Sequence, residues 1–144
     1  MPLVTRNHPK LTLEGARAVL GAAQRRAGEL RCPVNIAVVD EGAHLLAFER
    51  MDGAKPSSIA IALVKAQAAA MRRAATGPAM TGDQINVPLT LGLAAASPSG
   101  QTPIRGGVPI IVDSEVVGAI GVSAGTEEQD ADIAACGAAA LEQA

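Results

Sequence analysis

Residues 106–141 read GGVPIIVDSEVVGAIGVSAGTEEQDADIAACGAAAL and predict two strands followed by a helix. Residues 108–112 and 116–122 are rich in β-branched side chains, and residues 113–115 form a polar break of the length that joins antiparallel neighbours. A helix is expected to begin near Thr126, because Thr126 and Gln129 have the spacing of a capping box. The stretch therefore predicts a hairpin whose second strand leads into a helix.

One face of this helix carries a carboxylate among apolar residues. The positions that recur at steps of three and four are Asp130, Ile133, Ala134, Gly137 and Leu141. Such a face must lie on the sheet, so Asp130 is expected to point into the protein.

Three stretches together resemble the GlcG/HbpS-like family, which also includes the C-terminal domain of PduO-type proteins. They are residues 106–141, residues 38–54 (VVDEGAHLLAFERMDGA) and residues 57–70 (SSIAIALVKAQAAA); residues 76–105 match the family poorly. The resemblance implies one domain over residues 1–144 with a profilin-like α/β fold, in which an antiparallel sheet of four or five strands has helices on both faces. It also implies a haem- or small-ligand-binding accessory protein.

The composition indicates a folded chain with a core of small aliphatic side chains. Of the 144 residues, 49% are hydrophobic and 18% charged, while Phe48 is the single aromatic residue. More apolar side chains are present than a small sphere can hide, which predicts a homo-oligomer. A net charge of −2 and the lack of Trp and Tyr argue against nucleic-acid binding.

The sequence favours a cytoplasmic protein without a membrane span. Lys65 interrupts the longest apolar run, and the N-terminal residues MPLVTRNHPK lack the apolar centre of a signal peptide. Cys32 and Cys136 have no metal-binding spacing and are expected to be free thiols. No metal site is predicted.

The remaining elements follow from periodicity and from turn residues. Thr12 is expected to cap a first helix, and residues 34–40 and 44–50 to form a hairpin with Leu46 and Phe48 on one face. Residues 57–71 form a helix that is apolar all round except for Gln67 and Lys65. Residues 76–105, with a short helix at 87–95, are interpreted as the cover of a site.

Lys65 is the first candidate site residue, because its helix face carries small or apolar side chains. Its ammonium must reach solvent, pair with a carboxylate, or lie in a cavity with a lowered pKa. Asp130 and Asp52 are the candidate partners. A structural role and a catalytic role both remain open.

A second group of candidates suits an anion. Gly106 and Gly107 would let a ligand or another backbone approach closely, and Arg105 either binds an anionic group or is an ordinary loop arginine. Ser123 and the helix start at Thr126 suit a carboxylate, unless Thr126 itself caps the helix. A small anionic ligand is therefore expected.

The third candidate is His44, at the start of the second strand, where relatives often carry a histidine. It is either a solvated edge residue or an axial haem ligand; the other possible ligands are His8, Cys32, Met51 and Met80. GVSAG (residues 121–125) matches the G-x-S-x-G nucleophile motif, but both histidines precede Ser123 in a chain too short for that hydrolase fold.

Two functions follow. From the resemblance, the chain is a haem- or small-ligand-binding accessory protein. From the site chemistry, it is a cofactor-independent lyase, hydrolase or tautomerase that acts on a small carboxylate in a catabolic pathway. In the second case Lys65 or Asp130 is the acid or base, and Arg105 with the Thr126 helix start holds the anion.

Overall fold

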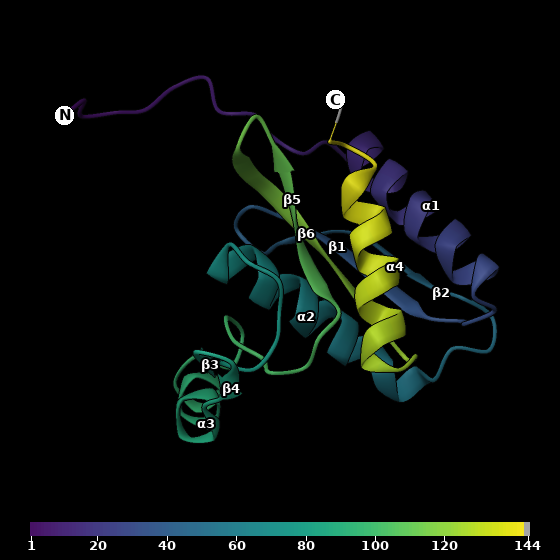
Figure 1. The fold of residues 1–144 in the computed structure, drawn as a ribbon. Helices are drawn as coiled ribbons and strands as arrows, with labels where there is room; N and C mark the ends of the chain where they lie inside the picture. Colours follow the sequence, from purple (N-terminus) through teal and green to yellow (C-terminus); the bar gives the residue numbers. More distant parts are fainter. Residues whose placement is uncertain (143–144) are drawn as a thin grey trace.

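A four-stranded antiparallel sheet with helices on both faces forms the body of the protein in the computed structural model, which describes residues 1–142 (Figure 1). The strand order is β2-β1-β6-β5. The strands are β1 Asn35–Asp40, β2 Leu45–Arg50, β5 Gly107–Val112 and β6 Glu115–Ser123. The helices α1 (Leu13–Glu29) and α4 (Glu127–Ala139) cover one face, and α2 (Ile59–Arg72) covers the other. The predicted fold class is confirmed.

Short stretches of sequence determine where the helices begin and how the hairpin of β5 and β6 turns. The hydroxyl of Thr12 accepts a hydrogen bond from the Gly15 amide at 3.0 Å and caps α1. A short 3-10 turn, Pro56–Ser58, leads into α2. Asp113 and Ser114 both have positive φ, at 51° and 63°, as in the two-residue turns whose twist matches paired strands.

The two faces of the sheet have different cores. The face under α1 and α4 contains large side chains, among them Ile36, Ile120 and Val122. The face under α2 contains Ala37 and Ala119, and it packs against alanines of the helix. Because both sides of this second contact are small, α2 lies close to the strands.

Strand β2 departs from the predicted alternation. Val38 pairs with Ala47 and Val39 pairs with Leu45, so Leu46 is an extra residue that forms a β-bulge. Leu46 consequently packs with Ala47 on the α1 side, while Phe48 packs on the α2 side. The prediction that Leu46 and Phe48 share one face was wrong, because a bulge breaks the period of two.

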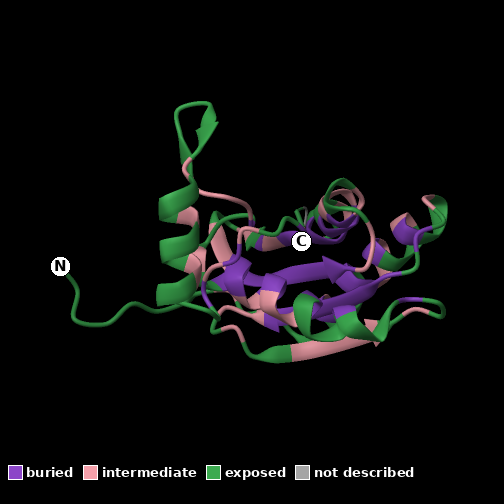
Figure 2. Cartoon of the chain, turned by 90° about the horizontal axis from the view of Figure 1, so that it is seen from below, coloured by how far each residue is buried: buried purple, intermediate pink, exposed green. Residues whose placement is uncertain are grey.

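Residues 77–104 form an arm that extends from the body. It contains the short strands β3 (Met80–Thr81) and β4 (Gln84–Ile85) and the helix α3 (Val87–Ala96), as the sequence predicted for the helix. None of the α3 residues is buried, and the arm stands away from the buried sheet (Figure 2). Within residues 1–142, no helix has both the length and the apolar character needed to cross a bilayer.

Candidate functional site

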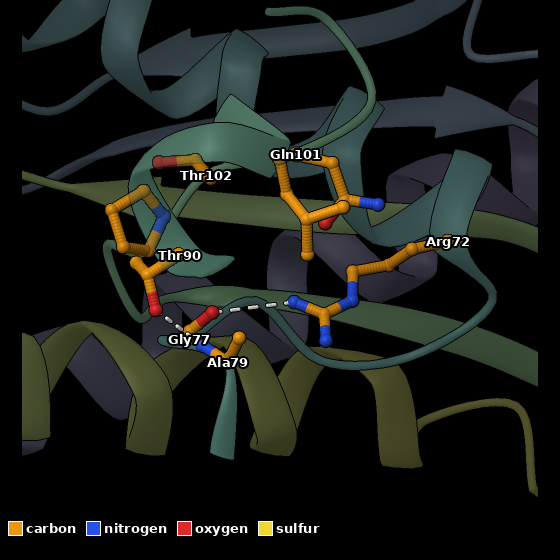
Figure 3. A pocket seen from close by; sticks show the side chains of 8 residues that line it. Arg72, Gly77, Ala79, Thr90, Gln101 and Thr102 are labelled. Atoms are coloured by element: carbon orange, nitrogen blue, oxygen red, sulfur yellow. Dashed lines mark hydrogen bonds between the residues drawn. The ribbon is translucent and has the colours of Figure 1, made fainter. Parts of the chain in front are cut away.

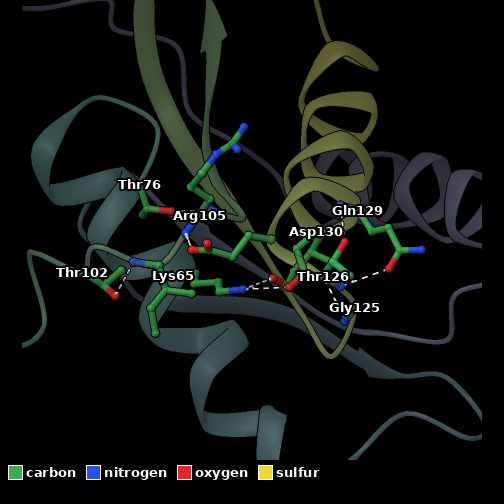
Figure 4. A network of polar contacts seen from close by, with 12 residues as sticks. Lys65, Thr76, Thr102, Arg105, Gly125, Thr126, Gln129 and Asp130 are labelled. Atoms are coloured by element: carbon green, nitrogen blue, oxygen red, sulfur yellow. Dashed lines mark hydrogen bonds and ion pairs between the residues drawn. The ribbon is translucent and has the colours of Figure 1, made fainter. Parts of the chain in front are cut away.

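A buried ion pair joins α2 to α4 at the end of the sheet. Lys65 Nζ lies 2.9 Å from Asp130 Oδ2 and donates a second hydrogen bond to the Val122 carbonyl oxygen at 2.8 Å (Figure 4). The side chains of Lys65 and Asp130 are only 1% and 4% exposed. Asp130 points inward as the helix face predicted, and it is this carboxylate, rather than Asp52, that pairs with the lysine.

The other oxygen of Asp130 ties the pair to the loop between β6 and α4. Asp130 Oδ1 accepts a hydrogen bond from the Gly125 amide at 2.9 Å. The carboxylate also lies near the start of α4, where the helix dipole favours negative charge. Two of the three N–H bonds of Lys65 have described acceptors, so the pair is nearly satisfied within the protein.

Gly106, just before β5, and Gly107, its first residue, make room for α2 and its lysine. A Cβ atom on Gly106, whose φ is +125°, would lie 2.9 Å from Lys65 Nζ and 2.9 Å from the Asp130 Cβ. A Cβ on Gly107 would collide with the backbone carbonyl of Lys65. The sequence left open whether a ligand or another backbone comes close to this glycine pair. The structure shows the close approach of another backbone, that of α2.

Thr126 and Ser123 lie beside the pair. The Thr126 hydroxyl accepts from the Gln129 amide at 3.2 Å, and the Gln129 side chain accepts from the Thr126 amide at 3.0 Å, which completes the capping box. Ser123 is buried at the end of β6. The helix start is therefore partly satisfied by its own residues.

Arg105 contributes its backbone to this region. Its amide donates to Glu127 Oε1 at 3.0 Å, whereas its side chain is directed away from Lys65 (Figure 4). The guanidinium does not contact the buried pair in this arrangement. Six predicted residues thus gather around the pair, and Arg105 borders them; the six are Lys65, Asp130, Gly106, Gly107, Ser123 and Thr126.

His44 lies at the opposite end of the sheet. Ser123 pairs with Asn35 at the first residue of β1, whereas the His44 carbonyl accepts from the amide of Asp40 at the last residue of β1. The five residue steps between Asn35 and Asp40 span about 17 Å, at ~3.3 Å per residue. Its side chain is 82% exposed, with Nδ1 3.3 Å from Asp40 Oδ1. The predicted residues therefore form two separate sites.

Asp40 is held as a carboxylate beside His44. Burial opposes its ionisation, but the backbone N–H groups of His44 and Gly42 donate to Oδ1 and lower the pKa of Asp40. A carboxylate on Nδ1 orients the ring and leaves Nε2 facing outward, as in many histidines that bind metal ions.

Two hollows flank the buried pair. An apolar pocket of about 160 Å³ is lined by Ala60, Ile61, Val64, Lys65, Thr102 and Ile104. On the other side, a groove of about 440 Å³ runs past Cys32 to the start of α4, with Arg31 and Lys55 on its walls. The sequence analysis missed these two basic residues, because they come from different turns and have no shared spacing.

Cys32 lies in this groove as a free thiol with a raised pKa. Burial raises its pKa, and the nearby charge of Asp130 raises it further. Both Cys32 and Cys136 are free. Among residues 1–142, no three side chains of His, Cys, Asp or Glu gather in a way that could hold a metal ion.

The fold and sequence place this protein in a known family. Residues 11–139 match the family described as Haem degrading protein HbpS-like, and the chain belongs to it. It is 38% identical over 113 residues to Protein GlcG of Escherichia coli strain K12, covering 78% of this chain and 81% of that protein.

Solved structures agree with this assignment. The Klebsiella pneumoniae protein ORFY superposes with a TM-score of 0.83 at 30% identity, over 100% of this chain and 99% of that one. The PduOC:haem complex superposes with a TM-score of 0.78 at 28% identity, over 92% and 96% of the two chains. The family expected from the sequence is confirmed.

Proposed function

We propose that this protein binds haem, or a small anionic ligand, as an accessory protein of the HbpS-like family. The observation that carries the proposal is His44, an exposed imidazole whose Nδ1 lies beside a carboxylate. Support comes from the family description and from the similar PduOC:haem complex. Bound haem would supply an iron centre, and His44 Nε2 would hold it.

The other axial candidates fit haem less well than His44. His8 also has a carboxylate on Nδ1, Glu115 at 2.7 Å, but it lies in the N-terminal segment before α1, outside the helices and strands. Cys32 is buried. Met80 lies on the arm, away from the body. The side chain of His44 is 82% exposed, so we propose that the ring is held at an exposed surface that a second copy covers.

A haemin titration tests this proposal. The wild-type protein is expected to shift the Soret band of haemin, and His44→Ala to abolish the shift. Asp40→Asn should weaken haemin binding about tenfold or more, because the carboxylate orients the ring.

His8→Ala is the matched control, since it removes the other histidine of the chain. It is expected to keep the wild-type spectrum. A Soret shift that survives in His44→Ala and disappears in His8→Ala would show that His8, and not His44, binds the haem iron. That result would overturn the proposal.

We also propose that the protein is a homo-oligomer that works in the cytoplasm in a catabolic pathway. The support for assembly is α2, whose outward side chains Ile59, Ile61 and Met71 are apolar and exposed. A monomer of 14.5 kDa in light scattering at micromolar concentration would contradict assembly.

A cofactor-independent enzyme acting on a small carboxylate is the second candidate. The observation in its favour is that Lys65 lines the apolar pocket and has one N–H bond beyond its two described acceptors. That N–H would hold a carboxylate or carbonyl oxygen that entered the pocket. The effect of Lys65→Met on stability, argued in the Discussion, separates this role from a structural one.

A further inference from the structure

The groove beside the buried pair carries two basic side chains. Arg31, in the turn after α1, and Lys55, just before the 3-10 turn that leads into α2, line its volume of about 440 Å³, and both are exposed. None of the nine described residues that line the groove is acidic. Within residues 1–142, neither basic residue forms an ion pair. The groove therefore attracts anions.

Other hollows of the molecule suit an anion less well. A groove of about 480 Å³ between α1 and β2 has Arg17 on its wall, but Glu49 lines it too and offsets the charge. At the base of the arm, Arg72 donates to the Gly77 carbonyl at 3.3 Å (Figure 3). The hollow there is only about 20 Å³, room for little more than one water.

The backbone at Arg31 does not account for an arginine. Its φ is 51°, in the left-handed region, and it follows the C-cap residue of α1, a position where glycine is common. What the arginine adds is its guanidinium, which can bind a carboxylate through two parallel hydrogen bonds.

The start of α4 forms a further wall of this groove. Gly125, Thr126 and Gln129 line it, and the capping box already uses the polar atoms of the last two. The positive end of the dipole of this 13-residue helix adds to the field of the two basic side chains. The helix start contributes field here and not a ready set of hydrogen bonds.

Asn35 is a second, independent sign of a ligand. It is fully buried at the first position of β1, and its Nδ2 donates to the Lys55 carbonyl at 3.0 Å, so its amide is directed at a wall of the groove. Because that carbonyl can only accept, the other amide atom is the oxygen. Within residues 1–142, this Oδ1 is the one buried side-chain nitrogen or oxygen without a hydrogen-bond partner. Such an acceptor calls for a donor from outside the chain.

We propose that the groove binds a small hydroxycarboxylate. Its carboxylate lies between Arg31 and Lys55, and its hydroxyl donates to Asn35 Oδ1. That oxygen is closed off behind the wall in the free chain, so the turn that carries Gly53 and Lys55 shifts to admit the hydroxyl. Gly53, at φ +88°, permits such a change. The inference rests on the small-anion half of the proposed function and does not involve His44.

A hydroxyl fits Asn35 Oδ1 better than an ammonium group does. Both groups donate hydrogen bonds, but the charges of Arg31 and Lys55 repel an ammonium on the same ligand. A hydroxy acid should therefore bind more tightly than the matching amino acid.

Malate, succinate and aspartate test the proposal. They share one dicarboxylate skeleton and differ at a single carbon, which carries a hydroxyl, a hydrogen or an ammonium group. Isothermal titration calorimetry at constant ionic strength, with no other carboxylate in the buffer, measures their Kd values. At least one enantiomer of malate should bind about three- to tenfold more tightly than succinate, through one hydrogen bond to an otherwise unpaired acceptor. Aspartate should bind most weakly.

Substitutions assign the two contacts. Arg31→Gly should weaken malate and succinate binding about tenfold or more, because a charge-assisted contact is lost. It should not destabilise the fold, since glycine adopts a φ of 51° without strain. Asn35→Ala should bind malate no more tightly than succinate. Circular dichroism checks folding, and the ligand series on the wild-type protein decides the hydroxyl contact if Asn35→Ala does not fold.

Arg25→Ala is the matched control. Arg25 is an exposed arginine of α1 outside the groove, and its loss should leave all three Kd values unchanged. If none of the three ligands binds, the groove proposal is overturned, while the haemin titration still decides haem binding. Equal binding of malate and succinate overturns the hydroxyl contact and leaves the small-anion function intact. Binding that survives Arg31→Gly places the anion elsewhere and overturns this site.

Discussion

Lys65 brings a full charge into an interior built largely of alanine and valine. The cost of removing an ammonium from water is offset here by Asp130 and by the Val122 carbonyl, both within 2.9 Å. The carboxylate has its own second partner in the Gly125 amide. This closed set of contacts favours a structural role, in which the pair fixes α2 against the start of α4.

Removing the lysine charge distinguishes the structural role from a ligand-binding one. We expect Lys65→Met to lower the free energy of unfolding by about 3–5 kcal/mol, because Asp130 would remain buried without its counter-ion. Urea denaturation measures this change. A variant that keeps or gains stability while losing ligand binding or turnover would instead show that Lys65 belongs to a carboxylate site.

Two further variants control this experiment. Lys65→Met combined with Asp130→Asn should recover part of the loss, since neither charge then stays buried and the Asn side chain still accepts from Gly125. Lys55→Met removes an exposed lysine and is expected to change stability by less than about 0.5 kcal/mol.

At the scale of elements, glycine decides how closely α2 approaches the sheet. A Cβ atom on Gly121 of β6 would collide with the Ala62 carbonyl and the Ala66 amide of the helix backbone. Backbone atoms cannot move aside as a side chain can. The distance between α2 and β6 therefore depends on Gly121.

We expect Gly121→Ala to destabilise the protein by about 1–3 kcal/mol or more, because the methyl group must push α2 away from β6. Gly28→Ala makes the same chemical change on α1, where nothing lies within 4 Å of the new Cβ. That control should stabilise by up to about 1 kcal/mol through helix propensity. Thermal unfolding measures the change in stability of both variants, which should have opposite signs. Equal signs would show that the contact between Gly121 and α2 does not determine the effect.

Elements whose determinants are local could be predicted from the sequence. The capping box at Thr126, the polar turn before Glu115 and the inward face that carries Asp130 each depend on residues a few positions apart, and all three are confirmed. The bulge at Leu46 could not be predicted, because it depends on how β2 pairs with β1.

The grouping of the candidate site residues could be predicted only in part. Gly106, Lys65 and Asp130 meet because β5 begins, β6 ends and α4 begins at the same edge of the sheet, where the middle of α2 packs. The predicted hairpin and helix implied the first three of these. The separation of His44 from that group depends on the direction of β1. The groove near Arg31 and Lys55 is formed by separate turns of the chain. Their relative position cannot be predicted from the spacing of residues along the sequence.

At the scale of the whole molecule, composition indicated more apolar surface than one chain hides. The structure shows where that surface lies: on α3, which has no buried residue, and on the outer side of α2. The sequence analysis interpreted residues 76–105 as the cover of a site. Of that segment, Thr102 and Ile104 line the apolar pocket beside Lys65 in the same chain.

If assembly hides these surfaces, thermal stability must depend on protein concentration. The subunits dissociate when they unfold. A tenfold increase in protein concentration therefore stabilises a folded dimer by about 1.4 kcal/mol, and each chain receives half of this free energy. For a chain of 144 residues this corresponds to a rise in Tm of roughly 2 °C. Differential scanning calorimetry over two decades of concentration measures the slope.

Leu91→Lys places a charge on the exposed apolar surface of α3. If α3 lies in the subunit contact, the Tm of this variant should not change with concentration, because the variant unfolds as a single chain. Ile111→Glu should keep the wild-type slope, since Ile111 lies outside both apolar surfaces. A wild-type Tm that stays flat over the same range would mean that folding and assembly are not linked. The exposed arm would then be stable without a partner, and the apolar surface of α2 would need another explanation.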